Sequence, residues 1–324
     1  MTRAKERKVV ESVEKMRYEP EDFRFATPKI VADYRAKRLK CDTLCEIGSG
    51  VGFQTIAFAK SCKKVYAVEI DCRKAAYLKK NMEKLGLKNV EVIEGDGLDK
   101  KIADKVKDAD VFFVDTERAE SEDARKLSSV KPDVSELVSL YKDVCIEVPP
   151  QTRDISLGCE KEYVSVSGEL NRLNLYFGRL KKYKTNVVIL PSETRLESTG
   201  RKSLKAAKEI RHKYLYEINP AVIRAGLVNE LPTAELFRYN NKEYLLSNKK
   251  IGSEFLTCYK ITSICEAKDI KENLAKSGCG KVILKHSVSP SEYWSLRNKY
   301  EKDLGGSLVC YLFLFENAVI CERI

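Results

Sequence analysis

A glycine-rich turn between a short apolar run and an apolar helical run constrains the fold of this chain most. Residues 45–53 read Cys-Glu-Ile-Gly-Ser-Gly-Val-Gly-Phe, and residues 54–59 continue as a helix. Alternate glycines let the backbone turn sharply from strand to helix and approach a ligand that side chains would exclude. The segment therefore predicts a nucleotide-binding turn. A dinucleotide fingerprint would place its third glycine where Phe53 stands, so the spacing differs from that motif.

Acidic residues end the three strands that are predicted after this turn. The runs 64–71, 90–96 and 110–115 are apolar segments that finish with carboxylates. Ligands of doubly wound sheets bind beyond the carboxyl ends of the strands, so these acids are expected at one crevice. A carboxylate at the end of the second strand can accept both hydroxyl protons of a ribose. The acids expected at the crevice are Glu46, Glu69, Asp96 and Asp115.

In this order and spacing, the turn and the acids resemble the class I methyltransferases that use S-adenosylmethionine. The resemblance implies an α/β fold with a Rossmann-like, mostly parallel sheet of seven strands. It also implies that the turn binds the amino-acid half of the cofactor, that Glu69 binds the ribose and that Asp96 binds the adenine. The alternative is a doubly wound domain with accidental acids at its strand ends. The implied cofactor-binding residues are Glu46, Gly48, Gly50, Gly52, Glu69 and Asp96.

The fourth strand ends in Asp115-Thr116-Glu117-Arg118, at the place where the resembled enzymes position the methyl acceptor. Asp115 or Glu117 can accept a proton, and Arg118 can bind a phosphate or pair with Glu117. We therefore name Asp115, Glu117 and Arg118 as catalytic candidates, with a surface ion pair as the alternative for the last two. Enzymes that methylate exocyclic amines usually have two prolines and an aromatic residue here. Their absence favours a ring nitrogen.

The charge balance makes nucleic acid the first partner to consider. The chain of 324 residues has 59 Lys and Arg against 48 Asp and Glu, a net charge of +11. Polyanions bind such surfaces by releasing counterions. A helix predicted over 29–39 carries Arg35, Lys37 and Arg38, and is expected either to cover the cofactor pocket or to contact RNA. No apolar run approaches the ~20 residues of a membrane span, and no signal peptide is recognised at the N-terminus, so a cytoplasmic protein is expected.

Eleven cysteines and two histidines give no metal-binding spacing. Cys-x-x-Cys does not occur, and His212 and His286 lie far apart in the sequence. We expect reduced, structural thiols and no bound metal. Cys41 and Cys45 form the close pair, for which a metal role is the minor alternative.

A second resemblance covers the C-terminal part. Residues 216–226 read Tyr-Glu-Ile-Asn-Pro-Ala-Val-Ile-Arg-Ala-Gly, with Gly226 inside a predicted helix, and a Ser-Gly-Glu-Leu hairpin occurs at 167–170. Both resemble prokaryotic methyltransferases that carry a small ferredoxin-like segment and a THUMP-like domain. The resemblance implies that the last module grips structured RNA, often tRNA. The expected parts are an N-terminal helical segment 1–40, the methyltransferase domain 41–200, a basic linker with the ferredoxin-like segment 201–252, and the THUMP-like module 253–324.

Lysines and arginines with interspersed aromatics, chiefly between residues 179 and 213, suit RNA because charges pair with phosphates and rings stack on bases. The alternative for that segment is a solvated linker. The RNA-binding candidates are Lys181, Lys182, Lys184, Arg201, Lys202, Arg211, Lys213, Lys281 and Lys285.

The sequence thus favours a cytoplasmic RNA methyltransferase with tRNA as substrate. The alternatives are a methyltransferase for a small molecule or protein, whose C-terminal module oligomerises, and a cofactor-binding protein without catalysis. The oligomeric state stays open.

Overall fold

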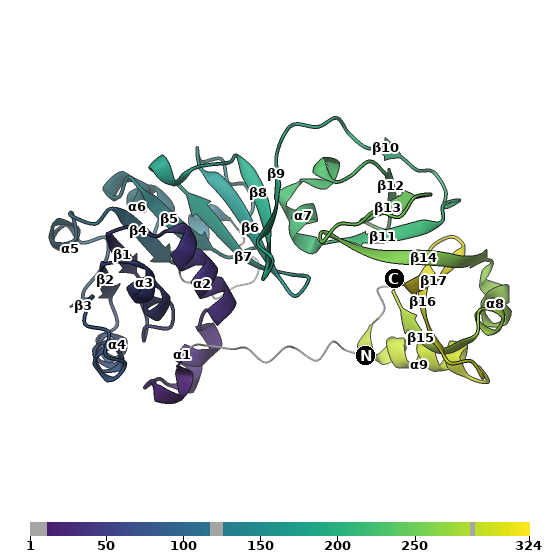
Figure 1. The fold of residues 1–324 in the computed structure, drawn as a ribbon, viewed down its shortest axis with the longest axis horizontal. Helices are drawn as coiled ribbons and strands as arrows, with labels where there is room; N and C mark the ends of the chain where they lie inside the picture. Colours follow the sequence, from purple (N-terminus) through teal and green to yellow (C-terminus); the bar gives the residue numbers. More distant parts are fainter. Residues whose placement is uncertain (1–11, 117–125, 286–288) are drawn as a thin grey trace. The chain divides into compact units, whose positions relative to one another are not determined.

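The computed structural model describes residues 12–116, 126–285 and 289–324 (Figure 1). The chain forms two compact units, Lys5–Ser198 and, in the main, Thr199–Ile324. We call them the N-terminal unit and the C-terminal unit. Each contains one mixed sheet and its own hydrophobic core.

The N-terminal unit alternates helices and strands over its first half, as a doubly wound fold requires. Its helices are α1 (Pro20–Phe25), α2 (Lys29–Arg38), α3 (Thr55–Ser61), α4 (Cys72–Lys84), α5 (Lys100–Lys105) and α6 (Val134–Leu140). Its strands are β1 (Thr43–Ile47), β2 (Lys64–Glu69), β3 (Val90–Glu94), β4 (Val111–Asp115), β5 (Val144–Val148), β6 (Glu160–Val166), β7 (Glu169–Tyr176), β8 (Thr185–Leu190) and β9 (Thr194–Glu197).

The sheet of the N-terminal unit has the order β3-β2-β1-β4-β5-β7-β6-β8-β9. Strands β1 to β5 are parallel, and β7 is antiparallel to both β5 and β6. The order reverses beside β1, which is where such sheets bind ligands. The sheet has nine strands among the described residues, against the seven that the sequence predicted. The sequence analysis did not predict β9, which pairs with β8 and forms the outer edge of the sheet.

Helices α2 and α3 pack on the middle of this sheet through small and aromatic side chains. Ala32 and Ala36 of α2 lie in one buried cluster with Phe58 of α3, Phe113 of β4 and Tyr176 of β7. Small residues on α2 let the helix approach α3 and the strands closely. The other face of α2 packs against β6 and β8 in a second apolar cluster. Helix α2 therefore spans the boundary between the parallel and antiparallel halves of the sheet.

The C-terminal unit has one eight-stranded sheet in the order β10-β12-β13-β11-β14-β17-β16-β15. Strand β11 pairs with β14, so residues 201–252 and 253–324 share a continuous sheet. The boundary that the sequence analysis drew after residue 252 thus lies between elements of one sheet. The elements are β10 (Lys205–Ala206), β11 (Tyr214–Ile218), α7 (Pro220–Ala225), β12 (Glu235–Tyr239), β13 (Lys242–Ser247), β14 (Leu256–Cys265), α8 (Ile270–Lys276), β15 (Cys279–Leu284), α9 (Pro290–Glu301), β16 (Leu308–Leu314) and β17 (Ala318–Arg323).

Helix α7 explains the distinctive sequence at 216–226. Asn219 caps its start by accepting the N–H of Ala221 at 2.9 Å, and Pro220 occupies the first turn. Gly226 has a φ of 69° and caps the end of the helix. The sequence analysis placed Gly226 inside the helix; the structure corrects this, because the left-handed conformation suits glycine and ends the helix. Among the described residues, no helix has the length and apolar character of a membrane span.

Candidate active site and its supporting network

The glycine turn between β1 and α3 has a left-handed backbone at all three glycines. Gly48, Gly50 and Gly52 have φ values of 78°, 58° and 101°. A Cβ on Gly48 would lie 2.7 Å from the carbonyl oxygen of Asp115, and one on Gly52 would lie 2.7 Å from Leu78. A Cβ on Gly50 would meet nothing within 4 Å. Packing against β4 and α4 thus requires glycine at positions 48 and 52. Gly50 instead faces open space, where a ligand has access to the backbone.

Glu69, at the end of β2, holds this turn in place. Its side chain is buried, and one carboxylate oxygen accepts the N–H of Gly50 at 2.6 Å. The other oxygen accepts the N–H of Asp71 at 2.9 Å. Each carboxylate oxygen can accept about two hydrogen bonds. The backbone therefore orients the carboxylate, which can still accept two further hydrogen bonds. The two vicinal hydroxyls of a ribose are donors of this kind.

Glu46 lies beneath the turn and not on its open side. Its side chain is 1% exposed, and it accepts a hydrogen bond from the hydroxyl of Thr55 at 2.6 Å. Burial raises the pKa of Glu46 to about 8, and the nearby carboxylates of Asp115 and Glu69 act in the same direction. The structure therefore places Glu46 as a support of the turn, among the other acids but below the surface that a ligand would contact.

Asp96 follows β3 and Asp115 is the last residue of β4. The sheet order brings the ends of β3, β2, β1 and β4 side by side. Asp96 is exposed and accepts the N–H of Leu98 at 2.9 Å. Asp115 is half-buried, and its backbone carbonyl contacts Gly48. The sheet order therefore places the strand ends that carry Glu46, Glu69, Asp96 and Asp115 at one edge of the sheet. Glu117 and Arg118 lie outside the described residues.

Residues before α2 cover one side of the glycine turn, which the sequence analysis did not foresee. The side chain of Asn81 on α4 is buried; it accepts the N–H of Arg17 at 2.6 Å and donates to the carbonyls of Arg17 and Val51 at 2.9 Å. Phe53 of the turn packs against Tyr18 and Phe23 in edge contacts with centroid distances of 5.6 and 6.3 Å. The chain before α2 is thereby fastened to the turn.

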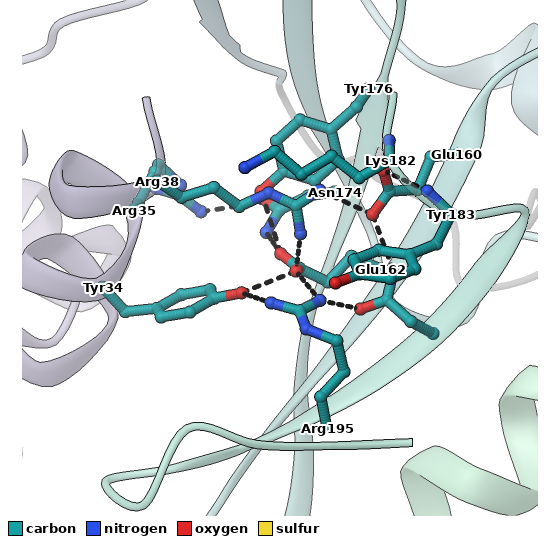
Figure 2. Close-up of polar contacts among 11 residues, drawn as sticks. Tyr34, Arg35, Arg38, Glu160, Glu162, Asn174, Tyr176, Lys182, Tyr183 and Arg195 are labelled. Atoms are coloured by element: carbon teal, nitrogen blue, oxygen red, sulfur yellow. Dashed lines mark hydrogen bonds and ion pairs between the residues drawn. The ribbon is translucent and has the colours of Figure 1, made fainter. Parts of the chain in front are cut away.

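A buried polar network ties helix α2 to the outer strands of the sheet (Figure 2). Two carboxylates from β6, Glu160 and Glu162, lie at its centre, and both are fully buried. Arg38 of α2 donates to Glu160 at 2.5 Å and also to Glu162, and Arg195 of β9 donates to Glu162 at 2.9 Å. Two guanidinium groups thus compensate two buried carboxylates, as burial of charge requires.

The remaining acceptor capacity of these carboxylates is also used. Glu162 also accepts hydrogen bonds from the hydroxyls of Tyr34 at 2.6 Å and Tyr176 at 2.8 Å, and from the amide of Asn174 at 3.2 Å. Glu160 also accepts from the amide of Asn186 at 2.7 Å and from the backbone N–H groups of Lys182 at 2.7 Å and Tyr183 at 3.1 Å. A network satisfied to this degree leaves no place for a ligand. We therefore read it as the connection that fixes α2 across the sheet (Figure 2).

A second buried arginine of α2 reaches the centre of the sheet. Arg35 is fully buried, forms an ion pair with Glu147 of β5 and donates to Gln54 at 2.8 Å, just before α3. Its guanidinium lies 4.4 Å from the ring centroid of Phe113. The sequence analysis considered Arg35 and Arg38 as RNA contacts; the structure shows both engaged in buried ion pairs instead. Lys37 is exposed and pairs with Glu193 at 2.7 Å.

The RNA-binding candidates of the N-terminal unit lie on its surface. Lys181, Lys182 and Lys184 are exposed in the segment between β7 and β8. The ammonium group of Lys181 donates to the carbonyl of Gly158 at 3.0 Å. Three neighbouring exposed cations form a local positive surface on the edge-strand side of this sheet.

The candidates of the C-terminal unit differ in their surroundings. Arg201, Lys202, Arg211 and Lys213 are exposed. Arg211 pairs with Glu209 at 2.8 Å, and Arg201 donates to the carbonyl of Glu230 at 3.2 Å. Lys281 and Lys285 are half-buried, and Lys285 pairs with Glu217 at 2.6 Å. The ammonium group of Lys285 is therefore occupied within the unit. Over the residues that the structure describes, no group of three or more side chains has the arrangement of a metal site.

Comparison with known proteins agrees with this geometry. Residues 25–130 match the family model of ribosomal RNA adenine dimethylase. The segment includes the glycine turn and the ends of β2, β3 and β4, so the match covers the candidate crevice. Over the whole chain, the fold is similar to a protein of Porphyromonas gingivalis W83 that is assigned as a methyltransferase. The TM-score is 0.76 and the identity 16%, with 94% of this chain and 83% of the other covered.

The curated relatives match over short segments. They are an uncharacterized protein of Methanocaldococcus jannaschii (42% identical over 55 residues, 17% of this chain), the probable ribosomal RNA small subunit methyltransferase A of Thermococcus kodakarensis (44% over 64 residues, 20%), and a protein-L-isoaspartate O-methyltransferase of Methanoregula boonei (43% over 56 residues, 17%). The matches cover 21%, 22% and 26% of those proteins. The two relatives that are named for an activity are named for different substrates, so these matches do not select a substrate.

The N-terminal unit therefore has the fold of S-adenosylmethionine-dependent methyltransferases. The prediction of that fold class is confirmed by the strand order and by the similar structure of the Porphyromonas protein.

Proposed function

We propose that this protein is an S-adenosylmethionine-dependent methyltransferase that modifies a base of RNA. The observation that carries the proposal is the glycine turn with its oriented acid. The N–H of Gly50 donates to Glu69 at 2.6 Å, and the space beside Gly50 is open. These residues fit the cofactor, because the open backbone can approach its amino-acid half and the carboxylate can accept from a ribose. S-adenosylmethionine, when bound, supplies an electrophilic methyl group.

The residues that would hold the cofactor are those of the strand-end edge. Gly48, Gly50 and Gly52 shape the turn, Glu69 would bind the ribose, and the exposed Asp96 would bind the adenine. Glu46 supports the turn from below. We propose that Asp115, half-buried at the end of β4, orients the methyl acceptor and accepts a proton from it. Glu117 and Arg118 remain candidates on their sequence alone.

RNA as the substrate class is supported by the family that residues 25–130 match, whose description names ribosomal RNA. It is also supported by the net charge of +11 and by the exposed Lys181, Lys182 and Lys184. We propose tRNA as the substrate, with a THUMP-like C-terminal unit that grips it, on the resemblance of residues 216–226. We propose a ring nitrogen as the acceptor, because neither prolines nor an aromatic residue follow Asp115.

The test is methyl transfer from labelled S-adenosylmethionine to purified RNA by the full chain. Total tRNA and total rRNA from cells that lack this gene serve as separate substrates, and the labelled RNA is digested to nucleosides for identification by mass and retention. We expect label in tRNA, on a base methylated at a ring nitrogen.

Each other outcome removes a defined part of the proposal. Label in rRNA alone would overturn the choice of tRNA, and a methylated exocyclic amine would overturn the ring nitrogen. Absence of label from both pools, with cofactor binding intact, would overturn RNA as the substrate. A small molecule or a protein would then be the acceptor class to test.

A further inference from the structure

Cys41 and Cys62 lie opposite each other where the first two strands of the parallel sheet begin. Strands β1 and β2 pair with Thr43 opposite Lys64, and the N–H of Lys64 donates to the carbonyl of Asp42 at 2.9 Å. Two positions before these partners stand Cys41 and Cys62. Neighbouring strands are about 4.8 Å apart, a separation that lies within the Cα range of disulfides, roughly 4.4–6.8 Å.

Cys62 belongs to a buried cluster with Leu39 and Phe58, and the half-buried Cys41 packs against this cluster. The thiol of Cys41 lies 3.4 Å from the carbonyl oxygen of Thr43, on the strand side of its backbone. The neighbouring Cys41 lowers the pKa of the Cys62 thiol. A thiol that ionises readily beside a second thiol is the arrangement in which thiol–disulfide exchange proceeds.

Access distinguishes this pair from Cys279 and Cys310. Cys41 is half-buried and Cys62 is 7% exposed, so a small reagent can approach the pair from the Cys41 side. A second pair, Cys279 and Cys310, lies within the core of the C-terminal unit at 0% and 1% exposure. Cys72 is exposed, at the start of α4. The close sequence pair Cys41 and Cys45 is not the structural pair.

We propose that Cys41 and Cys62 are a reversible disulfide site that is oxidised by a small-molecule disulfide such as oxidised glutathione. The Cys62 thiolate attacks one sulfur of the reagent, a mixed disulfide forms and one glutathione thiolate leaves. Cys41 then loses its proton and attacks the Cys62 sulfur, so the protein disulfide forms and the second glutathione thiolate leaves. Two protein thiols are oxidised, the reagent disulfide is reduced to two thiols, and the two protons pass to water or to the departing thiolates.

The disulfide would close residues 41–62, a segment that contains the glycine turn and α3. Such a closed loop stabilises chiefly by restraining the unfolded chain. The cysteines precede β1 and β2, whereas the candidate crevice lies at the opposite ends of these strands. Oxidation is therefore expected to raise stability without blocking the crevice. The proposal does not depend on the proposed substrate or reaction.

The test is incubation of the full chain with oxidised glutathione, followed by blocking of free thiols, proteolysis and mass spectrometry. We expect a Cys41–Cys62 cross-linked peptide and a rise in the midpoint of thermal unfolding of roughly 5–10 °C. Dithiothreitol should reverse both. The variant Cys41→Ser should lose the cross-link and the rise, and Cys72→Ser, which changes the exposed cysteine, should retain both.

Free thiols at Cys41 and Cys62 after oxidation, or stable glutathione adducts on either residue in place of the cross-link, would overturn the proposal. A cross-link that forms while the unfolding midpoint stays unchanged would overturn the stabilising role. Since Cys41→Ser can alter folding by itself, the wild-type chain before and after reduction provides the measurement that does not depend on any variant.

Discussion

Replacement of Glu162 by alanine is expected to lower the free energy of unfolding by roughly 3–5 kcal/mol, because breaking a buried ion pair leaves its partners uncompensated. Glu162 is fully buried and accepts hydrogen bonds from Arg38, Arg195 and two tyrosines. Its removal leaves two guanidinium groups with fewer acceptors inside the protein and opens a space between β6 and α2. Urea unfolding followed by circular dichroism measures the change.

Two further variants make this prediction specific. Glu162→Gln keeps the shape and one acceptor oxygen but removes the charge and replaces the other oxygen with an NH2 donor, so it should cost less than the alanine variant. Lys37 of helix α2 is exposed and pairs with Glu193. Lys37→Ala should change the free energy of unfolding by less than about 1 kcal/mol. Equal effects of Glu162→Ala and Lys37→Ala would show that the network does not fix α2 to the sheet.

Replacement of Asp115 by asparagine is expected to reduce methyl transfer by roughly 10²–10⁴-fold, the usual contribution of a positioned proton acceptor. Asp115 ends β4, and its carbonyl contacts Gly48 of the glycine turn, so its side chain belongs to the edge where the strand-end acids meet. Asparagine keeps the shape and removes the basic carboxylate. The affinity for S-adenosylmethionine should stay within a few-fold of wild type, because Glu69 and the turn remain.

The matched control for Asp115→Asn is Asp110→Asn. Asp110 precedes the same strand at its opposite end, where its carboxylate accepts the N–H of Thr43 at 2.9 Å. This variant should affect stability but not turnover at equal amounts of folded protein. Turnover that survives in Asp115→Asn, with cofactor affinity unchanged, would remove Asp115 from the reaction and direct attention to Glu117.

The local parts of the fold could be predicted from the sequence because their signals are local. Alternate glycines after an apolar run indicated the turn, and acids after apolar runs indicated the strand ends. An Asn-Pro pair indicated the start of α7. Gly226 was placed inside that helix because its left-handed backbone is not visible in the sequence. Strand β9 was not predicted because its four residues, Thr-Arg-Leu-Glu, include one apolar side chain and give no clear strand pattern.

The network around Glu162 could not be predicted, since its partners lie far apart in the chain. Arg38 is 124 residues from Glu162 in the sequence. Arg195 of β9, which donates to Tyr34, is 161 residues from Tyr34. The sequence offered one partial signal, because Glu160 and Glu162 alternate with Lys161 and precede an apolar run, which puts both acids on one face of a strand. Which residues compensate them depends on tertiary packing.

The central claim is that the crevice at the glycine turn binds S-adenosylmethionine through Glu69. Calorimetric titration of the wild-type chain and of two single variants tests it most directly. Glu69→Ala removes the acid that is bonded to Gly50, and Glu94→Ala removes the exposed acid at the paired position on the neighbouring strand.

We expect one molecule of S-adenosylmethionine per wild-type chain. Glu69→Ala should weaken binding by about tenfold to a hundredfold, which is the affinity lost with hydrogen bonds to a charged group. Glu94→Ala should bind as wild type does. No binding to the wild-type chain, or equal losses in the two variants, would contradict the assignment of this crevice.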